Sequence, residues 1–202
     1  MQKNIDKNNE FPLFPLSINV LPGAFLPLQI FEPRYIDMVK DCLSAEKGFC
    51  VVLSEHSEIK VNLQDLPQHV ATGTYVEVVD FNQLENGLLG LTVQGRHRMQ
   101  VLERRLKEDG LLIGEVVEIP EPDSSSLERD FSNIWRVLKE ISNHPEIKKL
   151  DLEIDFSNSS SVAYHLASLL PVTPKEKQEI LELDSNKERL ENLESIIKRL
   201  GG

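Results

Sequence analysis

Residues 11–35 read FPLFPLSINVLPGAFLPLQIFEPRY, and this stretch decides how the rest of the chain folds. It holds five of the eleven prolines and four of the eight phenylalanines, but only two charged residues, Glu32 and Arg34. Such a density of apolar side chains predicts burial, while each proline removes a backbone N–H that a helix or a central strand would need. We therefore expect extended strand, interrupted at the prolines and turned at Pro22-Gly23.

A helix is predicted to begin where this stretch ends. Pro33 suits the first helical position, and Glu32 before it is a modest capping residue. Apolar residues then recur at the spacing that places them on one helical face: Tyr35, Met38, Val39, Cys42 and Leu43. The stretch thus supplies broken strands and one helix to a single core.

The strings FPLFPL, VLPG and FLPLQIFEPRY, in that order, resemble the opening of the Lon N-terminal domain, the substrate-binding domain of ATP-dependent Lon proteases. The same domain occurs in small free-standing bacterial proteins and, more distantly, in cereblon. The resemblance runs on through TGT, GRHRM (with Met99 in place of the usual Phe) and HLASLLPVTPKEKQEILE, and covers about residues 11–200. It implies a stand-alone bacterial Lon-domain protein without ATPase or protease domains. An N-terminal fragment of a full-length Lon protease is the alternative.

Composition is that of a globular protein with an acidic surface. The net charge is −11, and the residues before and after position 119 carry −6 and −5, so neither half has the basic footprint of a nucleic-acid binder. The apolar runs are shorter than the roughly 18 residues of a membrane helix, and the polar N-terminus lacks a signal-peptide core. We expect a cytoplasmic protein. Cys42 and Cys50 match no metal-ligand spacing and are interpreted as buried free thiols.

The chain up to Ile119 is predicted to form strands. Candidate strands cover residues 49–53, 72–81, 88–94, 96–106 and 111–119, with a loop over 54–68. Asn86-Gly87 predicts a hairpin turn, and Lys107–Gly110 a second turn, while Gly95 favours a bend or bulge. We expect an α+β fold: a small antiparallel pseudo-barrel with one helix, followed by a C-terminal helical bundle. The resemblance implies that this barrel is the PUA-like one of Lon N-terminal domains.

Four segments are expected along the chain. Residues 1–10 form a disordered lead-in, 11–119 the β-rich barrel, 120–126 a linker rich in Pro and Ser, and 127–202 the helical bundle. In the bundle, Ser161 is a candidate cap, and capping boxes are predicted at Thr173–Glu176 and Ser185–Glu188. Gly201 is expected to end the last helix.

No motif for chemistry emerges from the sequence. The phosphate-binding string GxxxxGK[ST] and the nucleophile elbow GxSxG are absent. The five histidines are scattered without metal-ligand spacing: His56, His69, His97, His144 and His165. We therefore predict no catalytic residue, no cofactor and no metal. A small enzyme whose site is assembled from residues distant in sequence is the minor alternative.

Two clusters stand out as binding candidates. The first consists of apolar residues of the opening stretch with its two charges: Phe14, Phe25, Leu26, Phe31, Glu32 and Arg34. As a binding site, Glu32 and Arg34 would form a recognition pair for a bound peptide. The favoured alternatives are core packing for each apolar residue, and helix capping by Glu32 with Arg34 bonded to loop carbonyls for the charges. The second cluster is the basic strand segment with Arg96, Arg98 and Arg104 on one face, interpreted as a solvated face rather than a nucleic-acid site.

Three functions follow as hypotheses. The first is a non-catalytic module, adaptor or chaperone-like, that binds unfolded polypeptide segments or a protein partner, in part by adding an extended peptide to a sheet edge. The second is the small enzyme. The third is an RNA-binding PUA-like module, which rests on fold analogy alone. Neither a nucleic acid nor a membrane is favoured as partner, and the sequence does not give the oligomeric state.

Overall fold

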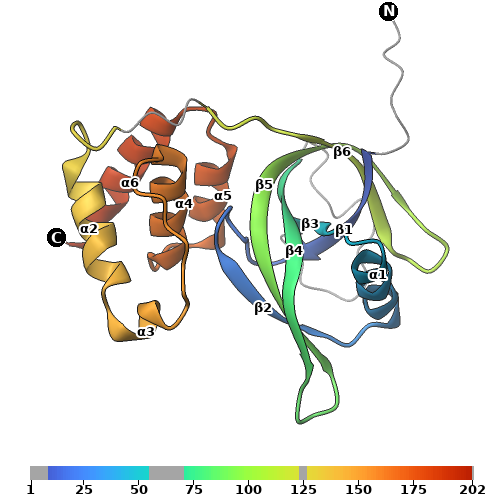
Figure 1. Cartoon of the computed structure of the whole chain (residues 1–202). Helices are drawn as coiled ribbons and strands as arrows, with labels where there is room; N and C mark the ends of the chain where they lie inside the picture. The colour runs from blue at the N-terminus through green and yellow to red at the C-terminus, as the bar shows by residue number, and fades with distance from the viewer. Residues whose placement is uncertain (1–8, 55–70, 123–126, 202) are drawn as a thin grey trace, which may run out of the picture. The chain divides into compact units, whose positions relative to one another are not determined.

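The computed structural model describes residues 9–54, 71–122 and 127–201, and contacts divide the chain into two compact units (Figure 1). One unit comprises Met1–Val20 and Phe25–Ile119 and holds the sheet, while the other comprises Pro120–Gly202 with Leu21–Ala24 and holds a helical bundle. Within the described ranges, no helix is both long and apolar enough to cross a membrane. Residues 1–8 of the predicted lead-in, 55–68 of the predicted loop and 123–126 of the predicted linker lie outside the described residues.

In the described part of the first unit, six strands form one sheet: β1 (Glu10–Leu16), β2 (Phe25–Ile30), β3 (Phe49–Leu53), β4 (Ala71–Gln83), β5 (Leu89–Leu106) and β6 (Leu112–Glu118). Their order is β2-β5-β4-β3-β1-β6, and a further pairing of β5 with β6 closes five of the strands into a ring. The predicted α+β pseudo-barrel is therefore confirmed. One pairing corrects it: β1 and β3 run parallel, with Leu13 opposite Cys50. The chain passes through β2 and a helix between them, a connection long enough to restore the strand direction.

Strand β5 links the sheet together because it is long enough to pair with three neighbours. Its first part, Leu89–Gln94, pairs with β2, the longer stretch Leu89–Val101 pairs with β4, and the part from Met99 onward pairs with β6. Val76 lies opposite Gly95 and Tyr75 opposite His97, so Arg96 is an extra residue that bulges the strand. The bend expected at Gly95 is thus confirmed, and the predicted strands on either side of it are one continuous element.

Turn residues set the two hairpins as predicted. Gly87 between β4 and β5 has φ +81°, and Gly110 between β5 and β6 has φ +82°, a left-handed backbone that glycine adopts without strain. Leu84 and Leu88 close the first turn through a 2.9 Å backbone hydrogen bond. The β4–β5 hairpin projects beyond the barrel as a two-stranded arm (Figure 1).

Helix α1 (Pro33–Ser44) begins at Pro33, as predicted. It buries Tyr35, Met38, Val39 and Cys42, whereas Leu43 at the edge of that face is 40% exposed. Within the barrel a core cluster joins residues from β1, β3, β5 and β6: Leu13, Cys50, Val52, Met99, Val101, Leu112 and Val116. Met99 packs in this core, as expected for a replacement of one large apolar residue by another.

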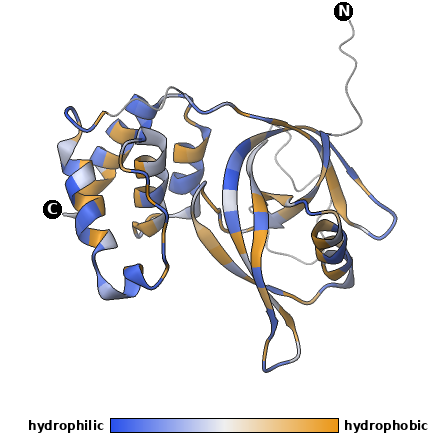
Figure 2. Ribbon diagram, in the orientation of Figure 1, coloured by the Kyte–Doolittle hydropathy of each residue, from blue (hydrophilic) through white to orange (hydrophobic). Residues whose placement is uncertain are grey.

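The second unit contains α2 (Ser132–Ser142), α3 (Pro145–Lys148), α4 (Ser159–Leu169), α5 (Pro174–Glu182) and α6 (Asn186–Leu200). Hydrophobic and hydrophilic residues alternate along these helices (Figure 2). Helix α4 is buried over most of its length and contacts α2, α5 and α6, so the bundle is built around it. Ser161 was expected to cap α4, but the cap is Asn158, whose side chain accepts from the N–H groups of Ser160 and Ser161.

The caps of α5 and α6 lie at the residues predicted from the sequence. Thr173 and Glu176 form a full capping box at α5, with the Thr173 N–H donating to the Glu176 carboxylate at 2.8 Å. These bonds and Arg199 hold the pKa of Glu176 at about 2. At α6 only one half of the predicted capping box is formed: Ser185 accepts from the Glu188 N–H, but the Glu188 side chain does not return a bond to the Ser185 N–H. Helix α6 ends before Gly201, as predicted.

Candidate polypeptide-binding surface

Phe14 is the member of the first candidate cluster that lies deepest in the β-rich unit. Its side chain is 6% exposed and contacts two other rings edge to face, Tyr35 at 4.4 Å and Phe49 at 5.8 Å between centroids. Edge-to-face packing of this kind adds about 1 kcal/mol to the burial of each ring. Phe14 therefore belongs to the interior, and a ligand on the surface does not reach it.

Phe25 and Leu26 lie on β2, and both are half-buried. Among the described strands β2 pairs only with β5, so it is an edge strand with one row of backbone groups unpaired in the sheet. Pro27 in its middle is exposed and has no N–H to donate. Such a proline weakens pairing along an edge without abolishing it, because the flanking residues still offer donors and acceptors.

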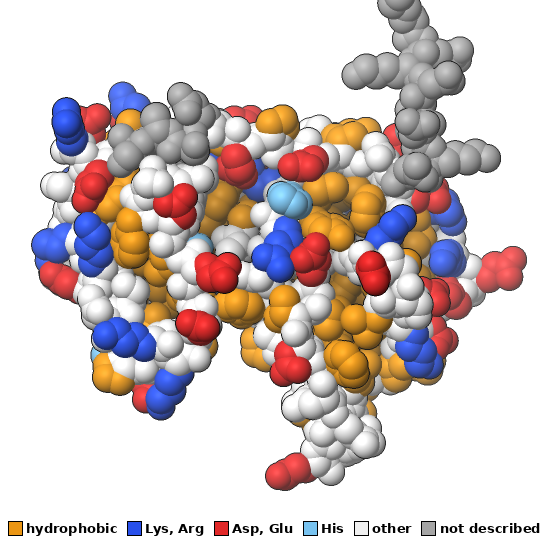
Figure 3. Space-filling view, viewed as in Figure 1, with side chains coloured by type: hydrophobic (Ala, Val, Ile, Leu, Met, Phe, Trp, Pro, Cys, Tyr) orange, Lys and Arg blue, Asp and Glu red, His pale blue; other side chains and the backbone are white. Residues whose placement is uncertain are grey.

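Phe31 follows β2 directly and is 58% exposed. A second phenylalanine, Phe81 on the arm, is 60% exposed. The space-filling view shows hydrophobic side chains gathered over the β-rich unit around the base of this arm (Figure 3). A contiguous patch of exposed apolar side chains is typical of surfaces that bind other proteins, whereas single exposed ones are common on any surface.

Glu32 and Arg34 bind each other, with 2.8 Å between the Arg34 Nη2 and the Glu32 Oε2. The Arg34 Nη1 also donates to the backbone oxygen of Gly110 at 2.7 Å, and its guanidinium lies 4.8 Å from the centroid of the Tyr35 ring. The expected bond from Arg34 to a loop carbonyl is confirmed. The expected capping by the Glu32 side chain is wrong: Glu32 is the N-cap residue, but its carboxylate makes no capping bond because it is bound to Arg34.

This ion pair has a positional consequence. The side chains of Glu32 and Arg34 are only 21% and 14% exposed, so the pair is shielded from much of the solvent screening that weakens surface ion pairs. It attaches the start of α1 to the β5–β6 turn at Gly110. Phe31 immediately precedes this attached segment.

A groove of about 380 Å³ lies where β2, β5 and β4 run side by side. Each strand contributes to its lining: Pro27 and Gln29 from β2, Asp80 and Asn82 from β4, and Gly90 and Thr92 from β5. A Cβ atom at Gly90 would lie 2.5 Å from the Asn82 Oδ1. Gly90 therefore allows the Asn82 amide to lie across β5. We call this feature the β2–β4 groove.

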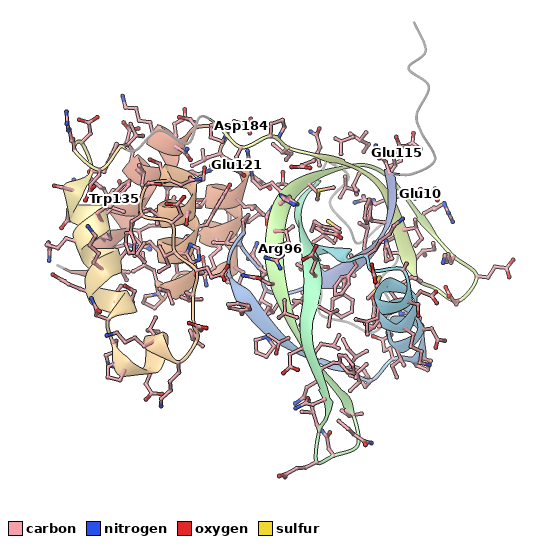
Figure 4. All side chains as sticks on the ribbon, in the orientation of Figure 1. Glu10, Arg96, Glu115, Glu121, Trp135 and Asp184 are labelled. Atoms are coloured by element: carbon pink, nitrogen blue, oxygen red, sulfur yellow. The ribbon has the colours of Figure 1, made fainter. Side chains whose placement is uncertain are left out.

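The basic segment of β5 carries less free charge than its sequence suggests. Arg96 projects from the bulge and binds Glu77 at 2.8 Å, and Arg105 binds Glu10 at 2.9 Å (Figure 4). Arg98 was expected on a solvated face, but its side chain is 1% exposed. The bulge at Arg96 changes the alternation of faces along β5, which a strict two-residue period does not anticipate.

The structure also reveals a polar cluster in the helical unit that the sequence did not indicate. Arg189 is fully buried, and its Nη1 donates to the Glu121 Oε2 and the Asn186 Oδ1, both at 2.9 Å. Tyr164 donates to the same Glu121 carboxylate at 3.0 Å. Arg189 precedes Leu193 by four residues on α6, so its spacing with the apolar positions could have revealed that it faces the bundle. Glu121, inside the predicted linker, gave no such signal.

Burial shifts the pKa values of three titratable side chains in the interior. Cys42 and Cys50 are free, as predicted, and burial raises their pKa values to about 11 and about 12. Burial lowers the pKa of His165, whose Nδ1 lies 2.8 Å from the backbone oxygen of Ser161. Within the part of the chain that the structure describes, no group of three or more His, Cys, Asp or Glu side chains could hold a metal ion.

The chain is similar in sequence to known proteins. The family model described as the ATP-dependent protease La (LON) substrate-binding domain matches residues 10–199. The Lon protease of Bacillus thuringiensis (strain Al Hakam) is 29% identical over 197 residues, which are 93% of this chain and 24% of that protease. Protein cereblon of Gallus gallus is 29% identical over 120 residues, 57% of this chain and 25% of cereblon. The chain thus spans about a quarter of the length of these curated relatives.

Solved structures share the fold over most of the chain. The crystal structure of a Lon N-terminal domain protein from Xanthomonas campestris has 31% sequence identity and a TM-score of 0.73, and the match covers 92% of this chain and 97% of that one. The N-terminal domain of a Mycobacterium avium complex Lon protease, at 18% identity and a TM-score of 0.63, shows the same fold.

Proposed function

The chain belongs to the family of substrate-binding domains of the ATP-dependent protease La (Lon), and from that membership we propose that it binds unfolded segments of other polypeptides and leaves them chemically unchanged. The observation that carries the proposal is the combination of an edge strand, β2, with the exposed Phe31 directly after it. An extended segment can hydrogen-bond to such an edge through its main chain, while an aromatic side chain supplies apolar contact.

This mode of binding does not require a particular sequence, because every polypeptide offers the same main-chain groups. It suits a protein that must recognise unfolded chains in general, and the aromatic contact adds a preference for segments with apolar side chains. Phe25 and Leu26 are proposed to contribute from the half-buried part of β2, and the Glu32–Arg34 pair to position Phe31. Phe14 is left out of the surface because it is buried.

We propose that the chain acts as an adaptor or as a holder of unfolded chains linked to proteolysis. Its curated relatives are about four times longer, and the name Lon protease assigns proteolysis to those whole proteins. The same surface would serve as the substrate-recognition part if these residues are followed by further Lon segments. The two buried free thiols fit a reducing compartment, so we propose the cytoplasm.

The RNA-binding alternative gains no support from Arg96, Arg98 and Arg105 of β5. Arg96 and Arg105 are each bound to a carboxylate, and Arg98 is buried. To bind these arginines, a phosphate backbone would have to replace their carboxylate partners and approach a protein of net negative charge.

A direct test is a titration with a permanently unfolded probe, a reduced and carboxymethylated protein labelled with a fluorophore. Anisotropy should rise with protein concentration to a plateau, and the native, oxidised form of the same probe should give no rise. The probe should be recovered intact by mass spectrometry after prolonged incubation. Absence of binding to the unfolded probe, or its cleavage, would contradict the proposal.

A further inference from the structure

The β2–β4 groove lies on one face of the sheet, and strand register identifies the residues on that face. Phe25 is opposite Gln94 and Gln94 opposite Glu77; Pro27, Thr92 and Asp80 form the next row, and Gln29, Gly90 and Asn82 the third. The intervening positions of β5, Leu91 and Val93, are 3% and 0% exposed and face the barrel interior. The polar residues of the groove therefore lie on the opposite, outer face of these three strands, and Leu28, Phe81, Leu84 and Leu91 complete its lining.

The polar side chains along the groove are available to a ligand. Among the described residues, no hydrogen bond or ion pair engages the side chains of Gln29, Asn82 or Thr92. Two amides and a hydroxyl can each donate and accept, which is what the N–H and C=O groups of an extended main chain require.

The two carboxylates on this face differ in their partners. Glu77 is bound to Arg96 at 2.8 Å and is therefore neutralised. Asp80 accepts a hydrogen bond from the Phe81 N–H at 2.9 Å, but within the described part of the chain it forms no ion pair. Asp80 thus places an uncompensated negative charge in the groove of a protein whose net charge is −11. A basic side chain of a ligand is complementary to it.

The dimensions of the groove suit one extended strand. Its walls come from β2 and β4, which flank β5 and are therefore roughly 10 Å apart, two strand spacings of about 4.8 Å each. A single extended polypeptide fits this width, whereas a helix, about 10–12 Å across with its side chains, would fill or exceed it.

We propose that the β2–β4 groove binds an extended polypeptide segment that carries an Arg or Lys side chain over Asp80, with Gln29 and Asn82 hydrogen-bonded to its main chain. This inference rests on the proposed function and adds a sequence preference to it: segments that combine apolar residues with a basic residue bind in preference to neutral or acidic ones. The site is separate from the Phe31 contact at the end of β2.

The test uses fluorescently labelled twelve-residue peptides that are identical except for one central position, which is Arg, Gln or Glu. The full chain should bind the Arg peptide about two- to fivefold more tightly than the Gln peptide, the range expected of an exposed ion pair. Asp80→Asn keeps an acceptor for the Phe81 N–H and should abolish this difference. Asp37→Asn, at an exposed carboxylate on α1 bound to Lys40, is the matched control and should preserve it. Asp80→Lys should reverse the preference toward the Glu peptide.

Equal affinity of the Arg and Gln peptides for the unmodified chain, or an unchanged preference in Asp80→Asn, would overturn the inference. Loss of binding at Asp80→Lys for all three peptides would overturn it as well, provided that circular dichroism shows the variant to be folded. If the carboxymethylated probe still binds in these cases, the proposed function survives and only the groove assignment fails. If neither probe nor peptide binds the unmodified chain, both fail.

Discussion

Arg189 on α6 donates a 2.9 Å hydrogen bond to Glu121, a residue 68 positions earlier that leads into the helical bundle (Figure 4). The arginine is fully buried, whereas the side chain of the glutamate is 36% exposed. The contact fixes the residues that enter the bundle against its last helix. A buried guanidinium is tolerated there only because several acceptors surround it.

Replacing Glu121 by Ala should destabilise the protein by about 1–3 kcal/mol, the cost of removing a charged partner from a buried donor. The exposed fraction of Glu121 keeps the expected value below that of a wholly buried pair. Urea unfolding followed by circular dichroism measures it. Arg189→Met in the Glu121→Ala background should recover part of the loss, because no buried charge then remains. An additive double variant would show that the two residues do not act through each other.

A substitution at the exposed Phe31 should affect binding, whereas a substitution at the buried Phe14 should affect stability. Phe31→Ser is expected to change the free energy of unfolding by no more than about 0.5 kcal/mol, as is usual for exposed positions, but to weaken binding of the carboxymethylated probe at least about fivefold. Phe14→Ala should instead cost about 3–5 kcal/mol of stability because it leaves a cavity between two rings. A folded Phe31→Ser variant with unchanged affinity would remove Phe31 from the binding surface.

The effects of substitutions at Gly23 and His165 on stability are expected to be non-additive. Gly23 has φ +82°, and a Cβ there would lie 2.6 Å from the Cε1 of the His165 ring. Gly23→Ala should therefore destabilise the helical unit by more than about 1 kcal/mol, through both backbone strain and the clash. In the His165→Ala background the same substitution should cost less, since only the strain remains. Equal costs in both backgrounds, from thermal or urea unfolding, would show that the ring is not the obstacle.

The capping box of α5 predicts a specific pH dependence. The folded-state pKa of Glu176 is about 2, below its ordinary value of 4.5, so its contribution to stability is complete above pH 4.5 and is lost as pH falls from there toward 2. Unfolding midpoints in urea should thus decrease over this interval in the unmodified chain. Glu176→Gln retains the capping bonds without the titration, so its midpoint should decrease less. Identical pH profiles for the two proteins would rule out this role of Glu176.

Local signals in the sequence predicted the elements whose geometry depends on few residues. Asn86-Gly87 predicted a hairpin because a tight turn needs positive φ, and Thr173-Pro174 with Glu176 predicted a helix start because the cap is complete within four residues. Pro33 predicted the start of α1 because its ring fixes φ near the helical value and it lacks an N–H that the first turn would leave unbonded. The succession of short, hairpin-linked strands predicted the barrel, and the family resemblance agreed with it.

The features that the sequence missed depend on contacts between distant residues. The parallel pairing of β1 with β3 depends on how the chain crosses between them. The Glu32 carboxylate does not cap α1 because it binds Arg34, whose guanidinium also donates to the Gly110 oxygen. Arg98 is buried because a bulge precedes it. The β2–β4 groove combines three strands whose residues lie up to 65 positions apart, from Pro27 to Thr92, so only the folded structure brings them together.

The central claim is that the β-rich unit binds unfolded polypeptide, and amide chemical-shift mapping tests it most directly. Isotope-labelled full chain is titrated with the unlabelled carboxymethylated probe, and shifts are followed residue by residue. We predict concentration-dependent changes that cluster on β2, at Phe31 and on the arm formed by β4 and β5. An unchanged spectrum at saturating probe, or changes confined to the helical unit, would contradict the claim.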